Sequence, residues 1–139
     1  MSFERLRDDV ERGLHLHAHA MATDTGLITP YTRLTRADAV QQLREANTAL
    51  TALRITDPLD DGGARAVVEA AARNGTLRTL RALDLDCKRL TVLSDDLVRL
   101  TDMQELMLGG NELTRLPVGV SRLGCLRVLD LRQNRLQTL

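Results

Sequence analysis

The feature that most constrains this chain is a leucine pattern that recurs every 23 residues in its second half. Three units begin at Leu80, Met103 and Leu126, and each has leucines at its fourth, sixth, eleventh and fourteenth positions. Four further apolar residues occupy matching places between the units: Leu97, Leu100, Val120 and Leu123. A fixed period of this length indicates that one structural unit is stacked on the next.

Each unit contains an L-x-L segment, whose alternation is typical of a strand with one buried face. These segments are Leu83-x-Leu85, Leu106-x-Leu108 and Leu129-x-Leu131. One such strand cannot bury its leucines alone, whereas stacked strands form a parallel sheet with a shared core. The chain has 27 leucines but only one Phe, one Tyr and no Trp, so this core is aliphatic. We therefore predict an α/β solenoid.

An asparagine follows two of these strands at the same place, as Asn111 and Asn134. Its amide can both donate and accept, so it can satisfy backbone groups buried under the turn. Lys88 occupies this place in the first unit, and there we expect a distorted or partly solvated turn with the lysine stem along the surface. Gly109 and Gly110 are expected to ease the turn before Asn111.

Together these residues resemble the leucine-rich repeat, L-x-x-L-x-L-x-x-N-x-L, from Leu50 to Leu139. The 23-residue units with Leu116-Pro117 are most similar to the short repeats of cytoplasmic adaptor proteins that bind small GTPases or scaffold signalling complexes. The resemblance implies a short right-handed β-α superhelix with the parallel sheet on its concave face. It also implies a cytoplasmic location.

An earlier unit is longer, because the strand at Leu53-x-Ile55 precedes the one at Leu83 by 30 residues. The intervening segment predicts a helix with one apolar face, made by Ala64, Val67, Val68 and Ala71. This unit resembles the helix-bearing repeat of ribonuclease-inhibitor-like proteins. Pro58 takes its asparagine place.

Residues 1–48 are predicted to be an N-terminal helical segment and cap, and residues 49–139 the repeats, with about four strands. Thr35-Arg36-Ala37-Asp38 has the spacing of a helix start. We expect a further helix over residues 2–14 and a loop over 20–30. Three histidines alternate at His15, His17 and His19, but no other ligand with suitable spacing adjoins them, so we predict no metal site.

The residues that flank the inward leucines are predicted to lie on the exposed surface of the sheet. Stacking of the strands aligns four of them in one column: Arg54, Asp84, Met107 and Asp130. We expect this surface to form a groove that suits a helix or loop of a partner protein with basic and apolar groups. The alternative is that these are ordinary solvated strand residues whose ion pairs contribute little. The candidate partner-binding residues are Arg54, Asp84, Asp86, Glu105, Met107, Asp130 and Arg132.

The chain has 19 basic and 19 acidic residues, and this neutral balance argues against capture of nucleic acid or a membrane surface. No catalytic residue or cofactor motif is found, so we predict a non-catalytic protein–protein interaction module, such as a signalling adaptor. One alternative is a self-assembling repeat fragment with an uncapped apolar end at Leu129, Leu131, Leu136 and Leu139. Another is a regulatory part of an enzyme complex.

Overall fold

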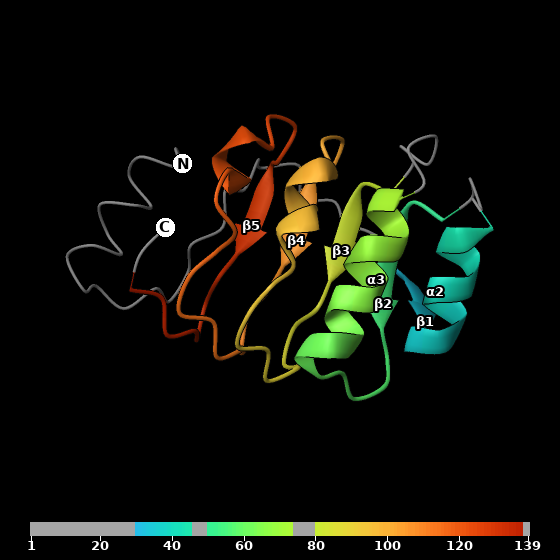
Figure 1. Cartoon of the computed structure of the whole chain (residues 1–139), viewed down its shortest axis with the longest axis horizontal. Helices are drawn as coiled ribbons and strands as arrows, with labels where there is room; N and C mark the ends of the chain where they lie inside the picture. The colour runs from blue at the N-terminus through green and yellow to red at the C-terminus, as the bar shows by residue number, and fades with distance from the viewer. Residues whose placement is uncertain (1–29, 46–49, 74–79, 138–139) are drawn as a thin grey trace.

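The computed structural model describes residues 30–45, 50–73 and 80–137. Their five strands form one parallel sheet in the order β1-β2-β3-β4-β5, and the connecting helices lie together on one side of it (Figure 1). The elements are β1 (Thr32–Leu34), α2 (Arg36–Arg44), β2 (Ala52–Ile55), α3 (Asp61–Arg73), β3 (Ala82–Asp84), η1 (Asp95–Arg99), β4 (Glu105–Met107), η2 (Val120–Arg122) and β5 (Val128–Asp130). This alternation confirms the predicted α/β solenoid.

The inward leucines form the core as predicted. Register pairs Leu53 with Leu83, Leu83 with Leu106 and Leu106 with Leu129, and all four side chains are 0 % exposed. Each strand therefore buries the leucines of its neighbours, as stacking of identical units requires.

The connections differ between the long unit and the short ones. In the 30-residue unit, the 13-residue helix α3 buries the predicted face of Ala64, Val67, Val68 and Ala71. In the 23-residue units the same layer contains only the 3-10 segments η1 and η2. The predicted return-path residues Leu97, Leu100, Val120 and Leu123 are all buried.

Strand β1 is an element that the sequence pattern did not predict, and it lies before residue 49, whereas the described residues after it contain four strands, β2 to β5. It has three residues, two of them exposed, so it carries no alternating signal. The helix start at Thr35 is confirmed, because its Oγ1 accepts a hydrogen bond from Asp38 N at 3.3 Å. β1 pairs with β2 and α2 packs on α3, and the division of the chain at residue 48 stays a prediction.

Several expectations lie outside the described residues: the helix over 2–14, most of the loop over 20–30, the three histidines and Leu139. Within the described ranges, no helix combines the length and the apolar character needed to cross a lipid bilayer.

Candidate functional site: the concave face

The candidate site is the sheet face that the helices leave uncovered, which we call the concave face. Register aligns Arg54 with Asp84, Asp84 with Met107 and Met107 with Asp130, so the predicted central column is confirmed as an arrangement. A second column consists of Ala52, Ala82, Glu105 and Val128. The strand ends place Thr56, Asp86, Gly109 and Arg132 in a third.

Two of the predicted acids are already neutralised within the face. Arg54 Nε lies 2.7 Å from Asp84 Oδ2, and Arg132 Nη2 lies 2.6 Å from Asp130 Oδ2. Asp84 and Asp130 are only 6 % and 2 % exposed. Burial tends to raise the pKa of Asp130, but the hydrogen bonds and charge of Arg132 outweigh it and hold that pKa below its usual value. The geometry therefore leaves these two carboxylates little capacity to contact a partner.

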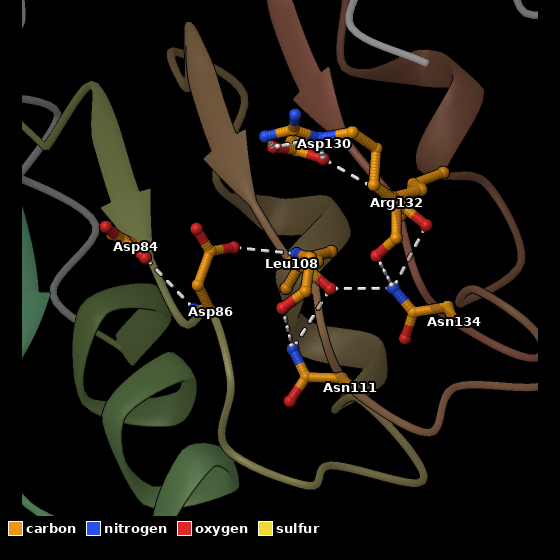
Figure 2. Close-up of polar contacts among 9 residues, drawn as sticks. Asp84, Asp86, Leu108, Asn111, Asp130, Arg132 and Asn134 are labelled. Carbon is orange, nitrogen blue, oxygen red and sulfur yellow. Dashed lines mark hydrogen bonds and ion pairs between the residues drawn. The ribbon is translucent and has the colours of Figure 1, made fainter. Parts of the chain in front are cut away.

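Asp86 differs from those two acids, because no Lys or Arg among the described residues lies within ion-pair distance of its carboxylate. Its Oδ1 accepts a hydrogen bond from Gly109 N at 2.7 Å, and its own backbone N donates to Asp84 Oδ1 at 3.0 Å (Figure 2). Burial, with the negative charges of Asp84 and Asp130, raises the pKa of Asp86 from 3.8 to about 6. The Gly109 hydrogen bond and the more distant charge of Arg132 oppose this shift.

The backbone of Gly109 lies close to the Asp86 carboxylate. A Cβ built on this buried glycine would lie 3.4 Å from both Asp86 Oδ1 and Asp130 Oδ1, so a side chain here would be in contact with both carboxylates. Met107, half-buried in the central column, supplies an apolar side chain two residues before Gly109. We call Asp86, Met107, Gly109, Val128 and Arg132 the open half of the concave face.

Tyr31 is a component of the site that sequence reasoning missed. Its hydroxyl donates to Glu105 Oε2 at 3.0 Å, although 74 residues separate the two. The Cζ atom of Arg54 lies 5.0 Å from the centre of the tyrosine ring. Tyr31 precedes β1 and Glu105 begins β4, so the two side chains meet over Ala52 and Ala82, which lie between them.

The burial of those alanines supports this placement, because Ala52 and Ala82 are only 4 % and 3 % exposed on a sheet face that the described helices do not cover. Burial raises the pKa of the Tyr31 phenol, and the Glu105 carboxylate adds to the effect through its charge and its hydrogen bond. The phenol therefore stays protonated and remains a donor. We call Tyr31, Ala52, Arg54, Ala82 and Glu105 the covered half of the concave face.

Two signals in the sequence bear on this feature. Tyr31 is the single tyrosine of the chain, and the unit positions at 52 and 82 hold alanines. A large amphipathic side chain and a pair of small ones on a common face are complementary in shape. Because the sequence pattern did not predict β1, however, it did not place Tyr31 beside the sheet.

An asparagine ladder fixes the strand ends that carry the open half. Asn111 Oδ1 accepts from Lys88 N and Leu90 N at 2.9 and 3.1 Å, and its Nδ2 donates to Leu85 O and Leu108 O at 2.9 and 3.0 Å. Asn134 repeats the arrangement one unit later, with Nδ2 2.7 Å from the same Leu108 oxygen (Figure 2). Gly110 has φ +68°, so the predicted easing of this turn by glycine is confirmed.

The expected distortion of the turn at Lys88 is confined to Arg89, with φ +54°, because the φ of +56° at Cys87 recurs as +68° at Gly110 and +56° at Gln133 in the other two units. The lysine stem does not simply follow the surface: its Nζ donates to Asp57 O of the preceding unit at 3.1 Å. Lysine can donate but not accept. The equivalent place in that preceding unit is Pro58, which has no N–H to be accepted. A lysine at position 88, which cannot accept a hydrogen bond, is therefore compatible with a proline at position 58, which has none to donate.

The expected open apolar end is not found at Leu129 and Leu131, which are both 0 % exposed, while Leu136 is half-buried. Self-association through this end stays a prediction. Among the residues that the structure describes, no group of three or more His, Cys, Asp or Glu side chains is placed to hold a metal ion.

Comparison with known families agrees with the geometry. Residues 78–136 match the family model described as leucine rich repeat, and these residues contain β3, β4 and β5 with the asparagine ladder. No significant match is found among curated proteins or among solved structures. Residues 78–136 are therefore leucine-rich repeats. Repeats of this family generally mediate protein–protein interaction, whereas the subtype of each repeat, including the ribonuclease-inhibitor-like unit before residue 78, stays a prediction.

Proposed function

We propose that this chain is a non-catalytic protein–protein interaction module that docks a partner on the open half of the concave face. The observation that carries the proposal is the contrast between Asp86 and the other acids. Asp84 and Asp130 have arginine partners at 2.7 and 2.6 Å, whereas Asp86 has none among the described residues.

The chemistry of the open half favours a partner segment with a basic and an apolar side chain. A lysine or arginine of the partner that approaches the strand end at Gly109 would lie beside the Asp86 carboxylate, and an apolar neighbour would pack on Met107. Charge complementarity of this kind mainly sets specificity and association rate. By the resemblance of the short repeats, we place this activity in a cytoplasmic signalling adaptor.

The test compares capture of binding proteins by the intact chain and by matched single variants. Asp86→Asn keeps an oxygen for Gly109 N and removes only the charge, while Met107→Lys adds a cation to the face. Val118→Lys is the control, because Val118 is 92 % exposed and lies outside the sheet. Asp84 and Asp130 are unsuitable, since breaking a buried ion pair destabilises the fold.

We expect one set of proteins to be retained by the intact chain and by Val118→Lys, and lost or reduced with the other two variants. The dissociation constant of the purified partner, measured by calorimetry, should rise at least about tenfold for Met107→Lys. Equal affinity of all three variants would contradict docking on the open half.

A further inference from the structure

We propose that the covered half of the concave face is a subsite for a tyrosine side chain of a partner protein, and that Tyr31 occupies it as an intramolecular competitor. The subsite itself is argued from the contacts of Tyr31 and is independent of docking on the open half. Only its use by a partner rests on the proposed function.

The floor of this subsite is flat and apolar. Ala52 and Ala82 pair directly in adjacent parallel strands, and both are almost fully buried although none of the described helices covers this face. Neighbouring strands lie about 4.8 Å apart, so two methyl side chains support an area comparable to one aromatic ring. Larger residues at either position would fill the space that the ring takes.

Two polar groups make the subsite selective for a phenol. The guanidinium of Arg54 lies over the ring at 5.0 Å, a distance at which a cation attracts the face of an aromatic system. Glu105 accepts the hydroxyl hydrogen bond at 3.0 Å, which a phenylalanine cannot supply. The Arg54 contact favours any aromatic ring, and the hydrogen bond to Glu105 is what distinguishes tyrosine from phenylalanine.

The cation is held in position by the sheet. Arg54 Nε is 2.7 Å from Asp84 Oδ2, and Asp84 is buried and also accepts from Asp86 N. An arginine fixed in this way loses little further freedom when a ring binds. The carboxylates of Glu105 and Asp84 would repel a phosphorylated ring, so the ligand class is the unmodified phenol.

Tyr31 lies at one edge of the sheet. It adjoins β1, a three-residue strand that pairs with β2 alone among the described residues and whose Thr32 and Arg33 are exposed. Segments with few buried contacts open at lower free energy than the core. The affinity of an external tyrosine is then reduced by the fraction of chains in which Tyr31 has left the subsite.

The Tyr31→Ala variant has an empty subsite. This variant is titrated with N-acetyltyrosinamide and with N-acetylphenylalaninamide, and the backbone amide NMR signals report binding. We expect the tyrosine probe to shift the signals of Ala52, Ala82 and Glu105, and to bind about tenfold more tightly than the phenylalanine probe through its one extra hydrogen bond. The unchanged chain should bind it at least about tenfold more weakly than the variant.

Two variants sharpen the result. Tyr31→Phe keeps a ring in place and should still exclude the probe in part, whereas Glu105→Ala combined with Tyr31→Ala should remove the preference for tyrosine. A folded Tyr31→Ala chain, checked by circular dichroism, that shows no shifts at this site would overturn the proposal. Equal binding of the two probes would overturn its phenol selectivity.

A measurement on the unchanged sequence covers the case in which Tyr31→Ala does not fold. Because the chain has one tyrosine, incorporation of 3-fluorotyrosine places a single fluorine signal on residue 31. Excess N-acetyltyrosinamide should move this signal towards its solvent-exposed position, while N-acetylphenylalaninamide should have a smaller effect. A signal that neither probe alters would contradict exchange at the subsite.

Discussion

The two halves of the concave face have the same strand geometry but differ in what satisfies their polar side chains. In the covered half, Tyr31 contacts both Arg54 and Glu105. In the open half, Asp86 keeps a negative charge without a described cation beside it. A parallel sheet of repeats therefore provides positions, and the residues placed on those positions decide whether the surface is closed or available.

The turns that follow the strands also differ, in the number of hydrogen bonds that connect each unit to the preceding one. In the second half of the chain, Asn111 and Asn134 each connect two units through several backbone hydrogen bonds. At the equivalent place one unit earlier, Lys88 makes one such contact, to Asp57 O. The open half thus rests on the more firmly connected scaffold, which suits a surface that must keep its shape when a partner binds.

The largest expected effect tests this difference in scaffold. Asn111→Ala leaves Lys88 N, Leu90 N and Leu85 O without their side-chain partner, while Leu108 O keeps its hydrogen bond from Asn134. We expect the variant to lower the free energy of unfolding by about 3–5 kcal/mol, since each buried group costs about 1–3 kcal/mol and some admit water. Lys88→Ala removes one contact and should cost about 1 kcal/mol. Urea unfolding of both variants measures the contrast, and similar losses would contradict the difference between the two scaffolds.

A second prediction separates the inner side of the sheet from the concave face. Leu106→Ala should cost about 2–5 kcal/mol, because its side chain is fully buried between neighbouring units and leaves a cavity. Met107→Ala, one residue further on the opposite side, should cost less than about 1 kcal/mol. Thermal melting of the two variants gives the comparison. Equal destabilisation would be incompatible with the assigned orientations.

The third prediction weakens the covered half alone. Tyr31→Phe removes the hydrogen bond to Glu105 and keeps the ring between Arg54 and the alanines. Because this bond is only partly buried, we expect a loss of about 1 kcal/mol in the free energy of unfolding. Partner affinity at the open half should not change. A partner that binds Tyr31→Phe much more weakly would show that the two halves do not act separately.

The smallest expected effect is an increase in the free energy of unfolding, and it concerns the open half. The pKa of Asp86 is raised to about 6 in the folded chain, so the folded state binds its proton more tightly than the unfolded state, in which the pKa is near 3.8. The contribution of Asp86 to stability is therefore greatest at acidic pH and is lost as pH rises from about 4 to about 6.

Asp86→Asn removes this loss and should stabilise the chain at neutral pH by about 1 kcal/mol or less, after allowance for solvent screening of a half-buried group. The difference between the unchanged chain and the variant, from urea titrations at acidic and neutral pH, isolates Asp86 from Asp130, whose lowered pKa gives the reverse trend. A difference that does not vary with pH would rule out the raised pKa.

Sequence reasoning predicted the inward leucines and the central column, because the 23-residue period and the strand alternation fix both. It did not predict β1, since a three-residue edge strand has no periodicity. The pairing of Arg54 with Asp84 is implied by their adjacent places in the column. The bidentate contact between Arg132 and Asp130 depends on side-chain rotamers, which the spacing does not determine.

The most direct test of the central claim is site-specific photo-crosslinking to the captured partner. A benzophenone side chain in place of Met107 lies in the open half, and one in place of Val118 lies on an exposed loop outside the sheet. We predict a covalent adduct with the partner from position 107 and none from position 118. An adduct from position 118 with none from position 107 would contradict docking on the concave face.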